Sequence, residues 1–185
     1  MLLCLTTFFW QATWSVLFQV NDAAVAHLLA KVGYLLILFL PTSLYQFLVE
    51  ISERTHERRW VAMSYAVAIT LAALLLTSDW LIAGTYSYFW GYYPKAGWLH
   101  PLHVLQTAVV VTRGLYVTFR QFQVATPEQR RRLQICIASV LIYFLAAIDY
   151  LCNYGVEFYP PGILFITLSI GPLAIATNWH TLVSP

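Results

Sequence analysis

The sequence predicts an all-α, polytopic transmembrane helix bundle of about six spans. The first observation is compositional: 60% of the 185 residues are apolar and 10% are charged, against about 25% charged residues in an ordinary soluble domain. The mean hydropathy is +0.68. The second observation is that the apolar residues gather in stretches of membrane-spanning length, roughly 20 residues. We therefore expect one membrane domain that occupies residues 1–185.

The expected spans follow one another with short connectors. A helix suits each stretch because it satisfies its own backbone N–H and C=O groups where water is absent. Six is an even number, which would place both chain ends on the same side. The expected spans are residues 2–20, 24–49, 60–77, 101–120, 133–152 and 161–178.

Local signals support several of these boundaries. Thr126 followed by Pro127 is typical of a capped helix start, whereas Pro41 and Pro172 fall inside expected spans and should kink them. The first apolar stretch begins directly after Met1 without a basic segment or a cleavage site, so we expect a retained span rather than a signal peptide. This abrupt start leaves open that a further helix belongs before it.

The distribution of arginine predicts the orientation. Short cytoplasmic connectors carry the excess of Lys and Arg, and seven of the ten basic residues lie in two connectors that should share one side. We therefore expect both termini to be cytoplasmic and the connector 79–101 to lie outside. The arginines of the two connectors are Arg54, Arg58, Arg59, Arg120, Arg130, Arg131 and Arg132.

The connector 79–101 holds eight aromatic residues and one lysine. Trp and Tyr gather at membrane interfaces because an apolar ring carries a polar group that prefers water. An interfacial belt would explain part of this content. The number of rings, together with three glycines that allow the chain to fold back, also suits a lid over a ligand. Both interpretations stay open at this point.

Ionisable residues inside the spans are candidates for function, because charge is costly in lipid. Asp149 and His103 should lie at similar depth near the outer face, where a carboxylate and an imidazole could pair; an ordinary inter-helix hydrogen bond is the alternative. Arg113 should lie deeper and reach toward Glu50 or Gln46. That contact would either lock helices together or serve signalling or a substrate.

The sequence favours neither an enzyme nor a metal protein. Its cysteines have no disulfide or zinc spacing, and no nucleotide-binding or hydrolase motif is present. A haem between His27 and His103 would need facing positions that the spacing does not establish, and His100 has no obvious partner. We predict no catalytic residue, no metal and no cofactor for this chain, and no nucleic-acid partner.

A family resemblance rests on several segments spread over the chain. They are LYQF (44–47) after Pro41, WGYYPKAGWLH (90–100), RRRLQ (130–134) and DYLCNYGVEFYPPG (149–162). Together they resemble the N-terminal seven-transmembrane sensor region of membrane histidine kinases. That family has seven helices with an outer N-terminus, whereas we count six with an inner one, as if a first helix were missing. The family also continues into a kinase or another output domain, and no motif of such a domain can be read in residues 1–185.

The resemblance implies a receptor in the bacterial cytoplasmic membrane. It implies that a small amphipathic or lipid-like ligand binds under the aromatic connector. The other implied partners are the surrounding membrane lipids, a cytoplasmic kinase or output domain and a second copy of the chain in a homodimer. Arg113, Pro41 and Pro172 would couple the helices, and the last span would pass the change onward. A transporter with a polar path, or a membrane anchor subunit, is the alternative. The expected ligand-binding residues are Trp90, Tyr92, Tyr93, His103, Asp149 and Tyr154.

Overall fold

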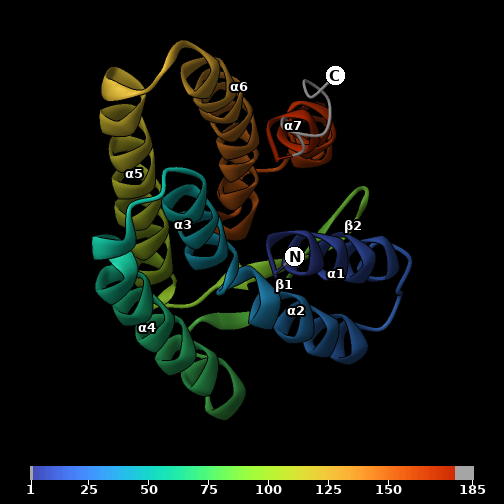
Figure 1. The fold of residues 1–185 in the computed structure, drawn as a ribbon. Helices are drawn as coiled ribbons and strands as arrows, with labels where there is room; N and C mark the ends of the chain where they lie inside the picture. Colours follow the sequence, from blue (N-terminus) through green and yellow to red (C-terminus); the bar gives the residue numbers. More distant parts are fainter. Residues whose placement is uncertain (1, 178–185) are drawn as a thin grey trace.

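The computed structural model describes residues 2–177, and an all-α bundle dominates it (Figure 1). The fold class predicted from the sequence is confirmed. The last residue of the expected span 161–178, and the segment 178–185 that would lead onward from it, lie outside the described residues. The elements are α1 (Leu2–Leu17), α2 (Ala23–Ile37), α3 (Leu40–Ile51), the short 3₁₀ helix η1 (Thr55–Glu57), α4 (Arg58–Thr77), β1 (Ile82–Tyr88), β2 (Gly91–Ala96), α5 (His100–Val124), α6 (Pro127–Phe144), the 3₁₀ segment η2 (Leu145–Tyr154) and α7 (Gly162–Thr177).

Six helical rods correspond to the six expected spans. Four of them are long and apolar enough to cross a membrane, namely Ala23–Ile51, Thr55–Thr77, His100–Val124 and Pro127–Tyr154. The two terminal rods, α1 and α7, are apolar but only 16 residues each. Many large apolar side chains on these rods are exposed, such as Phe8, Leu76 and Leu164. Such a surface suits lipid rather than water.

The second rod is broken close to Pro41. α2 ends at Ile37, two residues bridge the gap, and α3 begins at Leu40 with Pro41 in its first turn. Proline lacks an N–H and fixes its own φ, so it fits the first turn of a helix and interrupts a longer one. At the predicted kink, the helix is therefore interrupted for two residues within one apolar span. The second predicted position, Pro172, lies inside α7.

Side-chain caps fix the start of two helices. The carboxylate of Asp22 accepts hydrogen bonds from the backbone N–H groups of Ala24 and Val25 at 2.8 and 3.0 Å. The Thr126 hydroxyl accepts one from Gln129 N at 3.4 Å. Each cap satisfies N–H groups that have no partner within the helix. The helix start predicted at Thr126 and Pro127 is confirmed.

The aromatic connector forms a β-hairpin, an element that the sequence interpretation did not include. β1 and β2 pair antiparallel, with Tyr86 opposite Tyr93 and a bulge near Gly84. At the turn, Gly91 has φ +132° and packs so closely on Phe18 that an added Cβ would lie 3.0 Å from the Phe18 carbonyl oxygen. Glycine is required there for conformation and for space. The hairpin is thereby held against the α1–α2 connection.

The remaining packing places the helices in pairs (Figure 1). α1 lies against α2, α3 against α5, and α6 against both α5 and α7. The hairpin packs on α2 and on η2, so it covers the end of the bundle where α5 begins. We call this the hairpin end, and we call the opposite end, where the connectors 52–57 and 125–126 lie, the arginine end.

Candidate functional site

A cavity of about 50 Å³ lies where α1, α2, α3, α5, α6, η2 and β2 meet. This volume exceeds the roughly 15 Å³ that one water molecule needs. Its wall is almost entirely apolar and aromatic, and Asp149 is its one ionisable carboxyl group. Residues that represent the contributing helices are Trp10, Tyr34, Leu44, Val111, Tyr143 and Asp149.

Two tryptophans of α1 form one wall, and the sequence analysis did not single them out. Trp10 and Trp14 are buried, and their rings meet edge to face with centroids 6.3 Å apart. The indole N–H of Trp10 has no hydrogen-bond partner among the described residues. A buried donor normally has a partner. The i, i+4 spacing on one helix face was the available signal, because such residues point the same way.

Asp149 joins the cavity to the start of α7. Its Oδ1 accepts a hydrogen bond from Gly162 N at 3.0 Å, and its backbone carbonyl accepts one from the Tyr93 hydroxyl at 3.3 Å. A Cβ at position 162 would lie 2.1 Å from Asp149 Oδ2. The carboxylate therefore caps α7 across a contact that only glycine leaves room for. This connects η2, β2 and α7 through one residue.

The expected pair between Asp149 and His103 is not formed within residues 2–177. His103 Nε2 instead lies 2.9 Å from the Tyr150 hydroxyl. The Asp149 carboxylate instead accepts a hydrogen bond from Gly162 N at the start of α7, 13 residues further along the chain. The pairing hypothesis was wrong because it considered depth in the membrane and not the rotation of each helix.

Two histidines of α5 and three tyrosines form a buried polar cluster under the hairpin. His100 is fully buried and lies 2.9 Å from the Tyr34 hydroxyl and 2.7 Å from the Tyr154 hydroxyl. His103 is also fully buried and contacts Tyr150. His100 therefore has two partners, contrary to the expectation. The cluster connects α2, α5 and η2 at the hairpin end.

The six expected ligand residues fall into three groups. Tyr93 and Asp149 line the cavity, and His103 and Tyr154 belong to the polar cluster beside it. The other two lie on the hairpin: Trp90 packs its ring against Phe18, Tyr88, Tyr93 and Tyr159, and Tyr92 is partly exposed opposite Ser87. A ligand-binding role for all six stays a prediction.

Arg113 forms its ion pair with Glu57, so the predicted partners Glu50 and Gln46 are wrong. Its Nε and Nη2 donate to the Glu57 carboxylate at 2.8 and 3.1 Å. Its Nε also contacts the Tyr45 hydroxyl, which itself donates to Glu57. The guanidinium lies over the Trp60 ring, 4.6 Å from the centroid. The cluster fastens α5 to η1, α3 and α4 at the arginine end.

Glu50 and Gln46 contact each other instead. The Gln46 amide donates to Glu50 at 2.7 Å and accepts from the Tyr65 hydroxyl at 2.6 Å. Glu57 lies in η1, a short polar connector, and is 4% exposed. A glutamate in such a connector gives no sequence signal of burial, which explains why it was missed.

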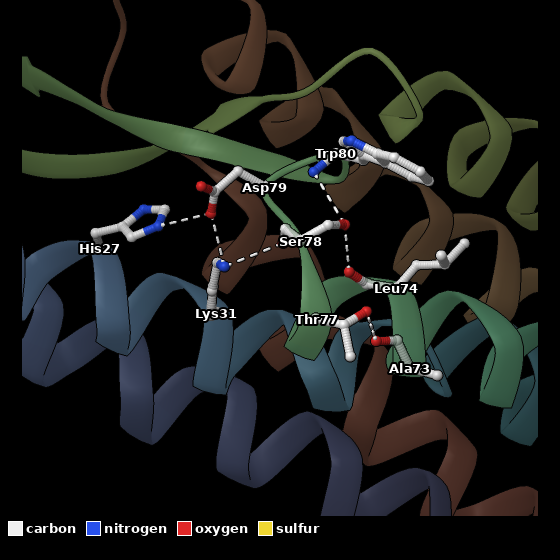
Figure 2. A network of polar contacts seen from close by, with 8 residues as sticks. All are labelled: His27, Lys31, Ala73, Leu74, Thr77, Ser78, Asp79 and Trp80. Atoms are coloured by element: carbon white, nitrogen blue, oxygen red, sulfur yellow. Dashed lines mark hydrogen bonds and ion pairs between the residues drawn. The ribbon is translucent and has the colours of Figure 1, made fainter.

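A second charged cluster lies on the surface at the hairpin end (Figure 2). Asp79 Oδ1 lies 2.7 Å from Lys31 Nζ and 3.3 Å from His27 Nε2. Lys31 also donates to the Ser78 carbonyl at 3.1 Å. The neighbouring lysine lowers the pKa of the Asp79 carboxyl below its ordinary range. These contacts fasten α2 to the segment between α4 and β1.

No group of three or more His, Cys, Asp or Glu side chains placed to hold a metal ion occurs in residues 2–177. The three cysteines are free thiols. The polar groups inside the bundle are therefore a carboxylate cap, an imidazole–phenol cluster and an ion pair. These groups can bind, orient and couple, and of the three the Asp149 carboxylate lines the cavity.

Apolar rods with exposed apolar flanks and buried polar contacts define this chain as a polytopic membrane protein. A family model, described as the N-terminal 7TM region of histidine kinases, matches residues 1–184. The chain belongs to this family, and the resemblance predicted from the sequence is confirmed. No curated protein and no solved structure matches the chain. The family's name refers to seven spans, whereas the described residues form seven α-helices in six rods, since α2 and α3 share one apolar stretch.

Proposed function

We propose that this chain is the ligand-sensing domain of a two-component sensor histidine kinase. A small amphipathic or lipid-like molecule binds in the cavity beneath the hairpin and changes how the helices pack. One observation supports this most directly: Asp149 lines the cavity and also bonds the first residue of α7, Gly162. A ligand that displaces or recruits this carboxylate acts on the last described helix of the domain.

The coupling requires two arrangements of the bundle. A ligand shifts an equilibrium only when it binds the two states with different affinity. The Asp149–Gly162 contact offers two such states, capped and uncapped. In the uncapped state the start of α7 loses a partner, and α7 moves relative to η2. The change then reaches a cytoplasmic kinase domain, while the chain itself has no catalytic role.

The proposal includes a membrane orientation and further partners. We place the hairpin end outside and the arginine end in the cytoplasm of a bacterial inner membrane, on the basis of the positive-inside rule. Membrane lipids surround the exposed apolar flanks, and a homodimer fits a kinase-linked receptor. A transporter would instead use Arg113, His103 and Asp149 as a path across the bilayer. Each of these three side chains has its own separate partner, which favours the receptor.

The test uses the purified chain in lipid nanodiscs, with native mass spectrometry and extraction of retained small molecules. Val111→Phe adds volume to the cavity wall, where Val111 is 3% exposed, whereas Val109→Phe adds the same volume on the outer face of α5, where Val109 is 57% exposed. We expect a defined molecule to be retained by the wild type and the Val109 variant and lost from the Val111 variant. A second filling variant, Ala147→Leu, acts from the η2 side of the cavity and guards against misfolding of the first.

An empty wild-type protein, or equal retention in all variants, would contradict the proposal. The aromatic hairpin would then be an interfacial belt, and the transporter or anchor interpretation would take precedence. Melting temperatures of the variants accompany the measurement, because overpacking a core costs about 1–3 kcal/mol. Loss of the molecule from a variant that melts like the wild type would assign binding to the cavity.

A further inference from the structure

A second hollow lies at the arginine end, outside the ligand cavity. It is an open groove of about 530 Å³ between the last turns of α3 and the first turn of α4. Both helices reach the membrane boundary here, because α3 ends and α4 begins next to the polar connector. The lining residues include Gln46, Glu50, Glu53, Arg54, Arg58 and Val61.

The groove contains charges of both signs in equal number. Glu50 and Glu53 supply two carboxylates, and Arg54 and Arg58 supply two guanidinium groups. Although they share one hollow, none of the four forms an ion pair in the described part of the chain. A cluster that only orients the helix by the positive-inside rule needs no carboxylates. The arrangement therefore suits a ligand that carries both charges.

One local feature also points to a missing acceptor. The Nε–H of Arg54 is shielded from solvent and has no hydrogen-bond partner among residues 2–177. A buried charged donor without an acceptor is costly.

We propose that this groove binds the headgroup of a zwitterionic phospholipid with a primary ammonium, such as phosphatidylethanolamine. Arg54 and Arg58 hold the phosphodiester, since guanidinium groups match phosphate oxygens well. Glu50 and Glu53 accept hydrogen bonds from the ammonium. A choline headgroup has no N–H to donate to the carboxylates. An anionic headgroup such as glycerol phosphate has no ammonium and would be repelled by the two carboxylates. The groove thus selects ethanolamine over both.

The proposal concerns a lipid site and does not depend on the sensing function. Its test places the purified chain in nanodiscs made of equal parts of phosphatidylethanolamine, phosphatidylcholine and phosphatidylglycerol. Native mass spectrometry then measures which lipid stays bound as the others are stripped. We expect phosphatidylethanolamine to be enriched about tenfold, which corresponds to the weak end of one charge-assisted hydrogen bond.

Variants assign the contacts. Arg54→Gln and Arg58→Gln should abolish the enrichment, and Glu50→Gln with Glu53→Gln should shift retention toward phosphatidylglycerol. Arg59→Gln is the matched control, because Arg59 is an exposed arginine of the same segment that does not line the groove. Enrichment of phosphatidylglycerol in the wild type, or an equal loss with Arg59→Gln, would overturn the proposal. A single Arg variant that fails to fold leaves the other Arg variant and the Glu pair to decide.

A last arm separates two sources of the same chemistry. Soluble glycerophosphoethanolamine carries the headgroup without acyl chains. If it displaces the bound lipid, the groove recognises the free phosphodiester; if it does not, the site belongs to the intact lipid at the membrane surface. Both outcomes support recognition of an ammonium-bearing phosphodiester.

Discussion

Removing the Glu57 carboxylate should release the cluster around Arg113. In Glu57→Gln, one carboxylate oxygen becomes an amide NH2 group that cannot accept a hydrogen bond. Arg113 then keeps at most one of its two hydrogen bonds at 2.8 and 3.1 Å, and both Arg113 and the Tyr45 hydroxyl lose a charged acceptor. Breaking a buried pair costs about 3–5 kcal/mol. Because 38% of the Arg113 side chain is exposed, we place the expected loss at about 2–3 kcal/mol, near the strength of one charge-assisted hydrogen bond.

A double-mutant cycle measures the pair itself. The free energy of unfolding is obtained from reversible titration with sodium dodecyl sulfate, followed by circular dichroism, for Glu57→Gln, Arg113→Met and the double variant. We expect a coupling energy of about 2 kcal/mol, which is well above the error of additivity. Glu128→Gln, in the exposed first turn of α6, is the control and should change little. A coupling energy below about 0.5 kcal/mol would be typical of an exposed surface ion pair and would refute the inference that the Glu57–Arg113 pair stabilises the fold.

Two further predictions concern the caps and the surface cluster. Gly162→Ala should displace the Asp149 carboxylate, because the added Cβ would lie 2.1 Å from Oδ2, and should destabilise the chain by about 1–3 kcal/mol in the same titration; Gly171→Ala, in the same helix with nothing within 4 Å, is the control, and equal effects would contradict the assignment. Lys31 lowers the pKa of the Asp79 carboxyl in the folded state. The ionised Asp79 therefore stabilises the fold above the ordinary Asp pKa of about 3.9, and this stabilisation is lost as pH falls through the lower pKa of the folded state. The difference in melting temperature between wild type and Asp79→Asn should therefore vanish in acid, and a difference that stays constant from pH 6 to pH 3 would show that this linkage is absent.

The sequence predicted the helices well because their signal is local. Apolar length and composition mark a span without any knowledge of its neighbours, and the break near Pro41 follows from the chemistry of one residue. The hairpin was missed, although the segment GTYSYFWGYY is rich in the aromatic residues that favour strands. Its register and the contact of Gly91 with Phe18 depend on a segment more than 70 positions earlier. Such a contact leaves no mark within the hairpin itself.

The sequence identified buried polar residues better than it identified their hydrogen-bond and ion-pair partners. Asp149 and Tyr93 were singled out, and both line the cavity. His103, His100 and Arg113 were noticed as buried polar groups, yet their partners are Tyr150, Tyr34 with Tyr154, and Glu57. A choice among partners at similar depth depends on how each helix is rotated about its axis. That rotation is a property of the whole bundle.

The hairpin also sets a limit on how deeply this end of the protein can sit. A sheet of two strands has an unpaired row of N–H and C=O groups along each outer edge, and β1 and β2 form such a sheet. Hydrocarbon offers these groups no partner, so they must reach water or lipid headgroups unless protein covers them. α5 begins at His100, only four residues after β2 ends at Ala96. We therefore expect the hairpin to lie at the membrane surface rather than in the hydrocarbon, and the bilayer to begin near the first turn of α5.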